Sequence, residues 1–356
     1  MGSISHEDLP KPWIETPCVL SPPLSRAAGC NIYLKLENLQ PSGSFKSRGI
    51  GNMMFRAIAA SSASTTSSGT NPSDSRAVHF YCSSGGNAGL AAATSAVALS
   101  APATIVVPQT TSPFMVGKLR DLGAEVVQTG ANWGEADRYL REELLAKEEG
   151  RGVYVPPFDH PDIWAGAATI VDELAGQMEG VEVDGVVCNV GGGGLLCGIM
   201  EGLESRRKKT TTSGIGRARV LAVETVGAES LYRSVEKGEL VTLERITSIA
   251  TSLGAPRVAE ECFEWTRRRG DALVCSTVTD GEAVMGCVKL LDDARMLVEV
   301  ACGATIATAY NGDLRRYLGK GMSDEEWKGK NVVLVVCGGS NINLELLNKY
   351  KETYGV

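Results

Sequence analysis

The sequence predicts an α/β protein built from two parallel sheets, and two observations support this class. First, short apolar runs of strand length alternate along the chain with segments of helical length and periodicity. Strands separated by helices of this length need crossover connections, which produce parallel sheets. Second, several apolar runs end in turns rich in glycine and serine that open directly into the next helix. Such turns at the carboxyl ends of parallel strands are the usual ligand sites of α/β proteins.

The first series of elements begins with a strand at 31–36 and a helix at 51–60. A polar stretch at 61–76 follows, and we predict a flexible surface insertion there because it contains little to bury and the alternation resumes directly after it. The elements expected next are strands at 77–81, 103–107 and 125–129 and helices at 88–99, 112–122 and 133–149.

The second series follows the run Y-V-P-P-F-D at 154–159. Its expected strands are 185–190, 219–224, 272–278 and 331–336, and its expected helices are 163–178, 195–203, 229–237, 257–268, one from 281 and one from 342. We therefore expect two domains. A large domain would combine 1–40 with 161–356, and a small domain would span 41–160.

Composition narrows the classes of function. The chain has 356 residues, of which 43% are apolar and 22% charged, which is ordinary for a globular protein with two cores. A net charge of −7 argues against a nucleic-acid or membrane-surface partner. Ten cysteines are scattered without a C-x-x-C pair, and the N-terminus resembles neither a secretory signal nor an Arg-rich transit peptide. These features predict a cytoplasmic protein with reduced thiols.

Four successive glycines, Gly191 to Gly194, stand between an apolar strand and an apolar helix. They remove every side chain from the approach and leave main-chain N–H groups at a helix start, which favours phosphate binding over a merely tight turn. The run does not match G-x-G-x-x-G, and no Lys-Ser/Thr pair follows it. A single phosphate on a small cofactor therefore fits better than a nucleotide.

Three further turns carry candidate chemistry. The run S-G-S-F-K-S-R-G at 42–49 surrounds Lys46 with small residues and places Phe45 beside it, although a lysine near a helix start is often merely solvated. The run S-S-G-G-N-A-G at 83–89 forms a nest suited to a carboxylate, although Ser and Asn also simply cap helices. The run C-G-G-S-N starts at Cys337, which by itself is most simply a core cysteine.

Together these turns resemble the fold-type II pyridoxal-phosphate enzymes, whose fold is like that of the tryptophan synthase β subunit, and within them the L-serine/L-threonine dehydratases. The resemblance extends from E-T-P-C at residue 15 to the C-terminal helix. It rests on the four turns and on the runs A-T-I-V-V-P, V-Y-V-P-P-F-D, A-V-E-T-V-G-A-E-S and L-V-E-V-A-C-G-A. It implies that the cofactor lies between the two domains and that the large domain binds it.

The resemblance also implies residue roles. Lys46 would form the Schiff base with pyridoxal 5'-phosphate and then act as the base at the substrate Cα. The remaining cofactor contacts would come from Phe45, Asn87, Gly191, Gly192, Gly193, Gly194, Leu195 and Cys337. Phe45 would pack on the ring, Asn87 would bond the ring hydroxyl, and Cys337 would face the ring nitrogen. The substrate carboxylate would be received by Ser84, Gly85 and Asn87. A monovalent cation such as K+ would be held by Glu224, Ala228 and Ser230 with carbonyls around Leu253 and Ala255.

The implied reaction is that of a lyase, converting L-serine to pyruvate and ammonia and L-threonine to 2-oxobutyrate. The residues agree with this, because none of the three histidines lies in a Gly-rich turn and a neutral thiol at the ring nitrogen favours β-elimination over transamination. A serine racemase, a β-replacement enzyme of the same fold and a non-catalytic amino-acid sensor remain alternatives.

Two positions depart from the family pattern. Gly85 stands where some relatives carry alanine, which we expect to enlarge the substrate side of the turn, and Val300 replaces a common proline. Only sixteen residues follow Ser340, so we expect no regulatory domain and a catabolic role in amino-acid breakdown and gluconeogenesis. A homodimer is the family expectation.

Overall fold

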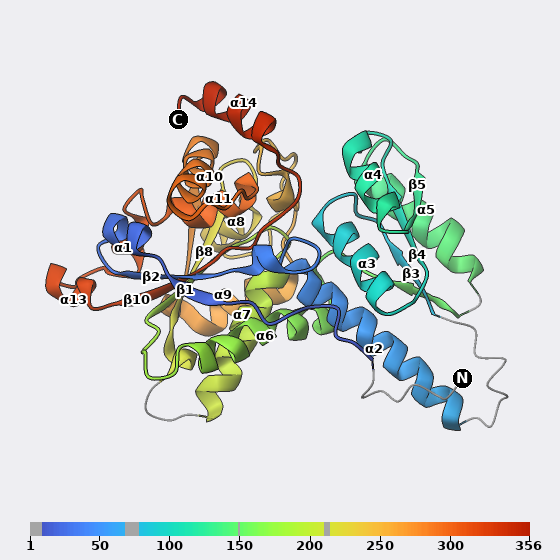
Figure 1. Ribbon diagram of the computed structural model, residues 1–356, viewed down its shortest axis with the longest axis horizontal. Coiled ribbons are helices and arrows are strands. Elements are labelled where there is room, and N and C mark those ends of the chain that lie inside the picture. Colours follow the sequence, from blue (N-terminus) through green and yellow to red (C-terminus); the bar gives the residue numbers. More distant parts are fainter. Residues whose placement is uncertain (1–8, 68–77, 149, 210–213) are drawn as a thin grey trace. The chain divides into compact units, whose positions relative to one another are not determined.

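The computed structural model describes residues 9–67, 78–148, 150–209 and 214–356. The chain forms two compact units, and both are α/β with parallel strands as predicted (Figure 1). The first unit contains the described residues of 1–14 and 40–166, and the second contains 15–39 and 167–356. The division falls within helix α6 (Pro161–Gln177). Among the described helices, none combines the length and the apolar character that crossing a bilayer would need.

The sheet of the first unit has four parallel strands in the order β5-β4-β3-β6. Their bounds are β3 (His79–Cys82), β4 (Ala103–Val107), β5 (Glu125–Gln128) and β6 (Gly152–Tyr154). Alternate residues of each strand face opposite sides. Phe80 and Cys82 join the core formed with α2, α3 and α4, whereas Tyr81 joins a smaller cluster formed with Ala136 and Leu140.

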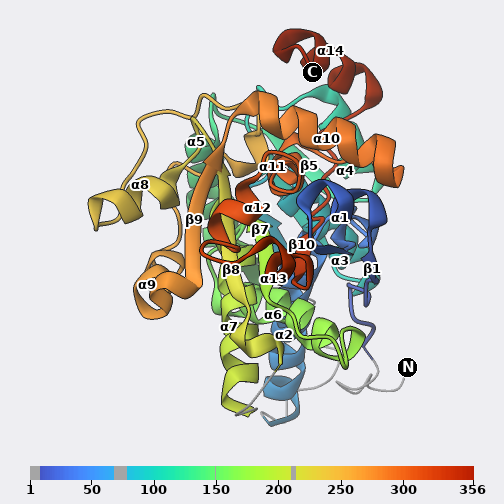
Figure 2. The ribbon, with the colours of Figure 1, turned by 90° about the vertical axis from the view of Figure 1, so that its left-hand side faces the viewer.

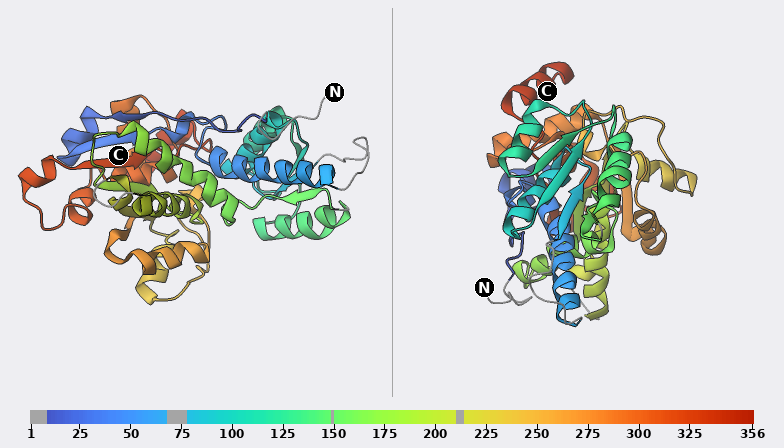
Figure 3. Two further views of the ribbon diagram at one scale, coloured as in Figure 1. Left: turned by 90° about the horizontal axis from the view of Figure 1, so that it is seen from below. Right: turned by 90° about the vertical axis from the view of Figure 1, so that its right-hand side faces the viewer.

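The helices of this unit are α2 (Lys46–Ser67), α3 (Asn87–Ala98), α4 (Pro113–Asp121) and α5 (Trp133–Tyr139). A π-helical turn at Leu140–Leu144 and a 3-10 turn at Leu145–Lys147 continue α5. Helix α2 runs as one long helix to Ser67 (Figure 3). The expectation of a flexible insertion is therefore wrong for 61–67, where no proline or glycine interrupts a run of small residues. The remainder of that insertion, 68–76, lies outside the described residues.

The second unit has a six-stranded sheet in the order β1-β2-β10-β7-β8-β9 (Figure 2). The strands are β1 (Cys18–Leu20), β2 (Asn31–Lys35), β7 (Gly185–Asn189), β8 (Arg219–Thr225), β9 (Leu273–Val278) and β10 (Asn331–Val335). All pairs are parallel except β1 with β2. Every residue of the central strand β7 is buried.

Helices α10 and α11 lie on one side of this sheet and α6 and α7 on the other (Figure 1). In addition to α6, the bounds are α1 (Pro22–Ala28), α7 (Gly194–Lys209), α8 (Ser230–Lys237), α9 (Glu260–Arg269), α10 (Asp280–Ala294), α11 (Val300–Ala307), α12 (Asp313–Tyr317), α13 (Asp324–Lys328) and α14 (Leu344–Tyr354). Helices α10 and α11 pack backbone to backbone, since a Cβ on Gly286 would lie 2.2 Å from the Gly303 carbonyl oxygen.

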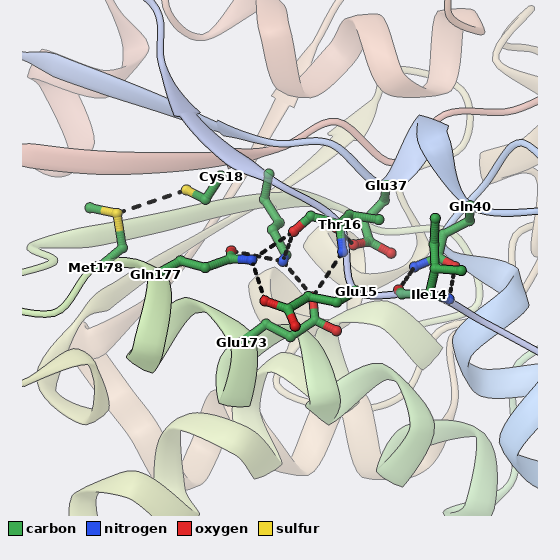
Figure 4. Close-up of polar contacts among 10 residues, drawn as sticks. Ile14, Glu15, Thr16, Cys18, Glu37, Gln40, Glu173, Gln177 and Met178 are labelled. Atoms are coloured by element: carbon green, nitrogen blue, oxygen red, sulfur yellow. Dashed lines mark hydrogen bonds and ion pairs between the residues drawn. The ribbon is translucent and has the colours of Figure 1, made fainter. Parts of the chain in front are cut away.

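A buried lysine joins three segments of the second unit. The Lys35 side chain on β2 is fully buried, and its Nζ donates to the Thr16 carbonyl at 2.6 Å, to Glu173 at 2.5 Å and to Gln177 at 3.0 Å. Figure 4 shows Thr16, Glu173 and Gln177 converging, with Glu37 accepting from the Thr16 hydroxyl at 2.5 Å. A buried charge is tolerated only when paired and hydrogen-bonded in this way. The network therefore fixes the extended segment after Ile14 against the sheet and α6.

Candidate active site

Lys46 is the first residue of α2. Its amine donates a hydrogen bond to the Pro157 carbonyl and lies 5.2 Å from the centre of the Phe45 ring and 6.0 Å from that of Phe158. The turn before it is fixed by the Ser47 hydroxyl, which lies 2.7 Å from the Ser42 hydroxyl and accepts from the Ser42 N–H at 3.1 Å. The small residues of the motif thus hold a half-buried amine between a carbonyl oxygen and two aromatic faces.

Two glycines bring α2 close to the start of α6. A Cβ on Gly49 would lie 2.7 Å from the Ile163 side chain, and one on Gly166 would lie 2.3 Å from the Arg48 carbonyl oxygen. No other residue fits at either position without moving a backbone. The last glycine of S-G-S-F-K-S-R-G therefore fixes the first turn of α2, which carries Lys46.

The turn S-S-G-G-N-A-G follows β3 and opens α3 at Asn87. It folds back on its own helix, because a Cβ on Gly89 would lie 1.8 Å from the Ser84 carbonyl oxygen. The Gly86 N–H donates to the Ser84 hydroxyl at 3.3 Å. The structure also brings this turn near Lys46. Burial raises the pKa of Cys82, which directly precedes the turn, to about 12, and the charge of Lys46 partly offsets that rise.

Two details of this turn differ from expectation. Ser83 is fully buried, and its hydroxyl is committed to Asp137 at 2.5 Å rather than added to the anion nest. The space expected to open at Gly85 is filled by Thr111, whose Cγ2 would lie 2.8 Å from an added Cβ. The part of the turn that remains half-exposed consists of Ser84, Gly85, Gly86 and Asn87.

The glycine turn of the second unit joins β7 to α7. Gly193 has φ +95°, and a Cβ there would lie 2.7 Å from Cys262 and 2.9 Å from Val258. A Cβ on Gly191 would lie 3.0 Å from the Leu253 Cα. Within the described ranges, the N–H groups of Gly192, Gly193, Gly194 and Leu195 donate to no acceptor. Unpaired donors at the start of a sixteen-residue helix fit an anionic group such as a phosphate.

Cys337 follows β10 and leads into a turn with φ +83° at Gly338 and +115° at Gly339. Asn189, at the end of β7, donates to the Cys337 sulfur at 3.1 Å and to the Ala301 carbonyl at 2.7 Å. A hydrogen bond with Cys302 and burial raise the pKa of the Cys337 thiol well above its ordinary range. The side chain is therefore a neutral thiol, and Asn189 places it beside the glycine turn that follows β7.

Sequence reasoning missed Glu299, which holds the Cys337 turn in place. Its carboxylate accepts from the Asn341 N–H at 2.7 Å and from the Ser252 hydroxyl at 2.5 Å. A Cβ on Gly339 would lie 2.3 Å from its Cδ. The signal was present, since the residue is the glutamate of L-V-E-V-A-C-G-A, but its partners are distant in the sequence.

The candidate cation ligands are only partly brought together. Glu224 accepts from the N–H groups of Leu231 and Tyr232 at 2.9 and 2.7 Å, and burial raises its pKa to about 8. Ala228 and Ser230 lie just before those two donors, and the buried Ser230 hydroxyl has no partner in the described part of the chain.

Leu253 and Ala255 bond each other, the Ala255 N–H donating to the Leu253 carbonyl at 2.8 Å, and no described hydrogen bond joins either to Glu224. Nor do the described ranges contain a cluster of three His, Cys, Asp or Glu residues that could hold a metal ion.

Comparisons with known proteins agree with this geometry. Residues 10–338 match the family of pyridoxal-phosphate dependent enzymes. An L-serine dehydratase of Saccharomyces cerevisiae is 40% identical over 91% of this chain and 92% of its own length. An L-serine dehydratase/L-threonine deaminase of Bos taurus is 40% identical over 96% of each chain. The crystal structure of a fungal L-serine ammonia-lyase from Rhizomucor miehei superposes with a TM-score of 0.81 at 34% identity, covering 96% of this chain and 99% of the other.

Proposed function

The chain belongs to the family of pyridoxal-phosphate dependent enzymes, and from this premise we propose that it is an L-serine ammonia-lyase that also converts L-threonine. The products would be pyruvate and ammonia from L-serine, and 2-oxobutyrate and ammonia from L-threonine. The observation that carries the proposal is the combination of an oriented Lys46 amine with a buried Cys337 thiol that accepts a hydrogen bond from Asn189.

The described residues fit the cofactor. The unpaired N–H groups from Gly192 to Leu195 would hold its phosphate together with Gly191, and Asn87 would bond its ring hydroxyl. Phe45 would cover one ring face, and Cys337 would face the ring nitrogen. When bound, pyridoxal phosphate supplies an electron sink for bonds broken at the Cα of an amino acid, and a neutral thiol at its nitrogen tempers that sink.

The protein's own groups perform the remaining tasks. Ser84, Gly85 and Asn87 would bind the substrate carboxylate and so orient the Cα–H bond. Lys46 would attach the cofactor and, once its amine is free, remove the Cα proton. The Pro157 carbonyl accepts a hydrogen bond from that amine and so fixes its direction. Loss of the β-hydroxyl group as water and hydrolysis of the released product then give the keto acid and ammonia.

Several finer points belong to the same proposal. The second unit would hold the phosphate and the first carries Lys46; the expected domains of 1–40 with 161–356 and of 41–160 differ from these units at 1–14, 40 and 161–166. A monovalent cation such as K+ would be held around Glu224, Ala228 and Ser230, with carbonyls near Leu253 and Ala255; the unpartnered Ser230 hydroxyl supports this. The enzyme would act as a cytoplasmic homodimer, as its family resemblance implies.

A coupled assay for pyruvate and 2-oxobutyrate with L-serine, D-serine and L-threonine, with and without K+, tests the activity. We expect both keto acids from the L-substrates and stimulation by K+. Serine recovered with inverted chirality and no pyruvate would instead establish a racemase. Absorbance of a lysine-bound cofactor without any turnover would establish an amino-acid sensor.

The assignment of Lys46 is tested by Lys46→Ala. Loss of the base should lower kcat by a factor of about 1,000 or more and abolish the visible absorbance of the lysine-bound cofactor. The control is Lys147→Ala, which removes an exposed lysine that pairs with the exposed Glu143 and should leave both unchanged. If the Lys46→Ala enzyme kept both its absorbance and its turnover, Lys46 could not be the residue that attaches the cofactor and removes the Cα proton.

A further inference from the structure

We propose that Asp137 is a positioning residue for substrate recognition, holding the turn that binds the substrate carboxylate. The inference rests on the proposed function, since that function assigns Ser84, Gly85 and Asn87 to the carboxylate. Asp137 lies on α5, far from the turn in the sequence, and only 13% of its side chain is exposed. It belongs to neither the cofactor contacts nor the substrate contacts described above.

The first contact is with the turn itself. The Ser83 hydroxyl donates to Asp137 Oδ1 at 2.5 Å, and Ser83 is fully buried. Ser83 lies between the last residue of β3 and the half-exposed Ser84, so its side chain fixes where the strand ends and the turn begins. Hydrogen bonds to a charged acceptor are shorter and stronger than those between neutral groups.

The second contact reaches the segment that orients Lys46. The Tyr154 hydroxyl donates to the same oxygen of Asp137 at 2.7 Å. Tyr154 ends β6, and the chain then passes through Val155, whose N–H bonds the Tyr81 carbonyl at 2.7 Å, to Pro157, whose carbonyl accepts from Lys46. Asp137 Oδ1 thus links two segments. One is the turn proposed to bind the substrate carboxylate, and the other leads to the carbonyl that accepts from Lys46.

The third contact neutralises the charge. Arg141 Nε donates to Asp137 Oδ2 at 2.9 Å, and its guanidinium stacks on the Tyr154 ring at 4.0 Å. Arg141 lies in the π-helical turn that continues α5. Such turns are rare, and they are frequently found at functional sites. Because Asp137 and Arg141 are four residues apart, one helical segment presents both the carboxylate and the arginine that satisfies it.

This arrangement is costly if its purpose is only stability. Burying a carboxylate carries a desolvation penalty that three hydrogen bonds offset only in part, and an apolar side chain would pack against β3 and β4 without that penalty. What the carboxylate adds is direction, because Ser83 and Tyr154 can satisfy it in one geometry only. A positioning role therefore explains a feature that packing alone does not.

The test uses two variants of the holoenzyme, Ser83→Ala and Asp137→Asn, titrated with L-serine and with L-serinamide, which lacks the carboxylate. Cofactor absorbance reports the half-saturating concentration of each ligand, and pyruvate formation gives KM and kcat. We expect half-saturation by L-serine to rise about tenfold in each variant, with the value for L-serinamide unchanged. KM should follow the L-serine value while kcat changes less. The cofactor absorbance without ligand should match that of the unaltered enzyme.

The control is Glu143→Gln, which removes an exposed carboxylate from the same helical segment, paired with Lys147 at 3.0 Å, and should change neither ligand. If Asp137→Asn does not fold, Ser83→Ala decides alone. Two results would overturn the proposal in favour of a structural role. One is an equal rise in the half-saturating concentrations of L-serine and L-serinamide, and the other is a lower melting temperature with unchanged half-saturating concentrations. If the unaltered enzyme bound both ligands but formed no pyruvate, the proposed function would be wrong. The half-saturating concentrations of L-serine and L-serinamide would still test the role of Asp137.

Discussion

Two glycine-rich turns occupy equivalent positions in the two units, and they are held in different ways. Each follows a buried parallel strand and opens a helix. The turn at Gly191–Gly194 is packed on its side-chain positions by Cys262, Val258 and Leu253. The turn at Ser83–Gly89 is closely packed at Gly89, where a Cβ would lie 1.8 Å from the Ser84 carbonyl oxygen, but its start is held by a polar contact, from Ser83 to the buried Asp137.

The difference follows the task that each turn would perform. A phosphate of a resident cofactor presents the same oxygens throughout the reaction, so its turn can be fixed by close packing. A substrate carboxylate must enter and leave with every turnover. A turn that binds a substrate carboxylate should be fixed at one end and accessible at the other. The buried Ser83 fixes one end, and the half-exposed Ser84 next to it is accessible. The first turn should therefore be intolerant of added volume at Gly193, and the second should tolerate it at the half-exposed Gly85.

The largest expected effect comes from Gly193→Ala. The new Cβ would meet Cys262 at 2.7 Å, and φ +95° is strained for any other residue. Together these should cost about 3 kcal/mol or more of unfolding free energy and displace the N–H groups that we propose hold the phosphate. Denaturant unfolding and cofactor titration measure the two losses. A Gly193→Ala protein with normal stability and cofactor affinity would show that the turn is not fixed by packing.

The matched control is Gly176→Ala on α6. A Cβ there meets nothing within 4 Å, and alanine in a helix is favoured over glycine by about 0.5 kcal/mol, or less at this position in the last turn. This variant should therefore be slightly more stable than the unaltered chain. It separates the effect of the Gly193 environment from that of removing a glycine.

The second effect, of intermediate size, concerns a carboxylate on α7, the helix that follows the glycine turn. This carboxylate should make the free energy of unfolding depend on pH. Burial and the neighbouring Glu261 raise the pKa of Glu201 on α7 to about 7. The folded chain therefore keeps a proton that the unfolded chain loses from about pH 4.5 upward. The contribution of Glu201 to the free energy of unfolding is therefore fully present below about pH 4.5. It is lost as the pH rises through 7. Because Glu201 is partly exposed, we expect a loss of about 1 kcal/mol by pH 8, and Glu201→Gln should abolish it.

Denaturant unfolding at pH 5 and pH 8 measures this difference. Glu325→Gln, at a carboxylate whose side chain is 86% exposed, is the control and should leave the pH dependence as it is. Identical pH dependence with and without Glu201 would contradict the assignment.

The sequence predicted the parallel strands well because their apolar runs are continuous, and β4 spans the predicted residues 103–107. It missed β1 and β6, which have three residues each and are too short to show a period. It also missed α11, which is buried on every side and so lacks an amphipathic pattern.

The candidate site divides in the same way. Lys46 and the four glycines lie in short sequence runs from which a chemical role can be predicted without the structure. Those roles stay predictions. Asp137 stands in no such run, and the run that contains Glu299 does not reveal its role, because each residue acts through partners that the fold, not the sequence, brings near. Asp137 lies 54 residues from Ser83, and Glu299 lies 47 residues from Ser252. Residues that hold a site in place are therefore visible only once the strands are assembled.

The smallest expected effect comes from Gly85→Ala, the same kind of change made in the other turn. Its Cβ would lie 2.8 Å from the Cγ2 of Thr111, the end of a partly exposed side chain on a loop, and Gly85 has no left-handed φ. Thr111 can shift, so the cost should be below about 1 kcal/mol, with KM for L-serine changed by less than about threefold. The double variant with Thr111→Ser removes that methyl group and should restore the lost stability. A loss as large as that of Gly193→Ala, or one that Thr111→Ser does not relieve, would show that both turns are held by packing alike.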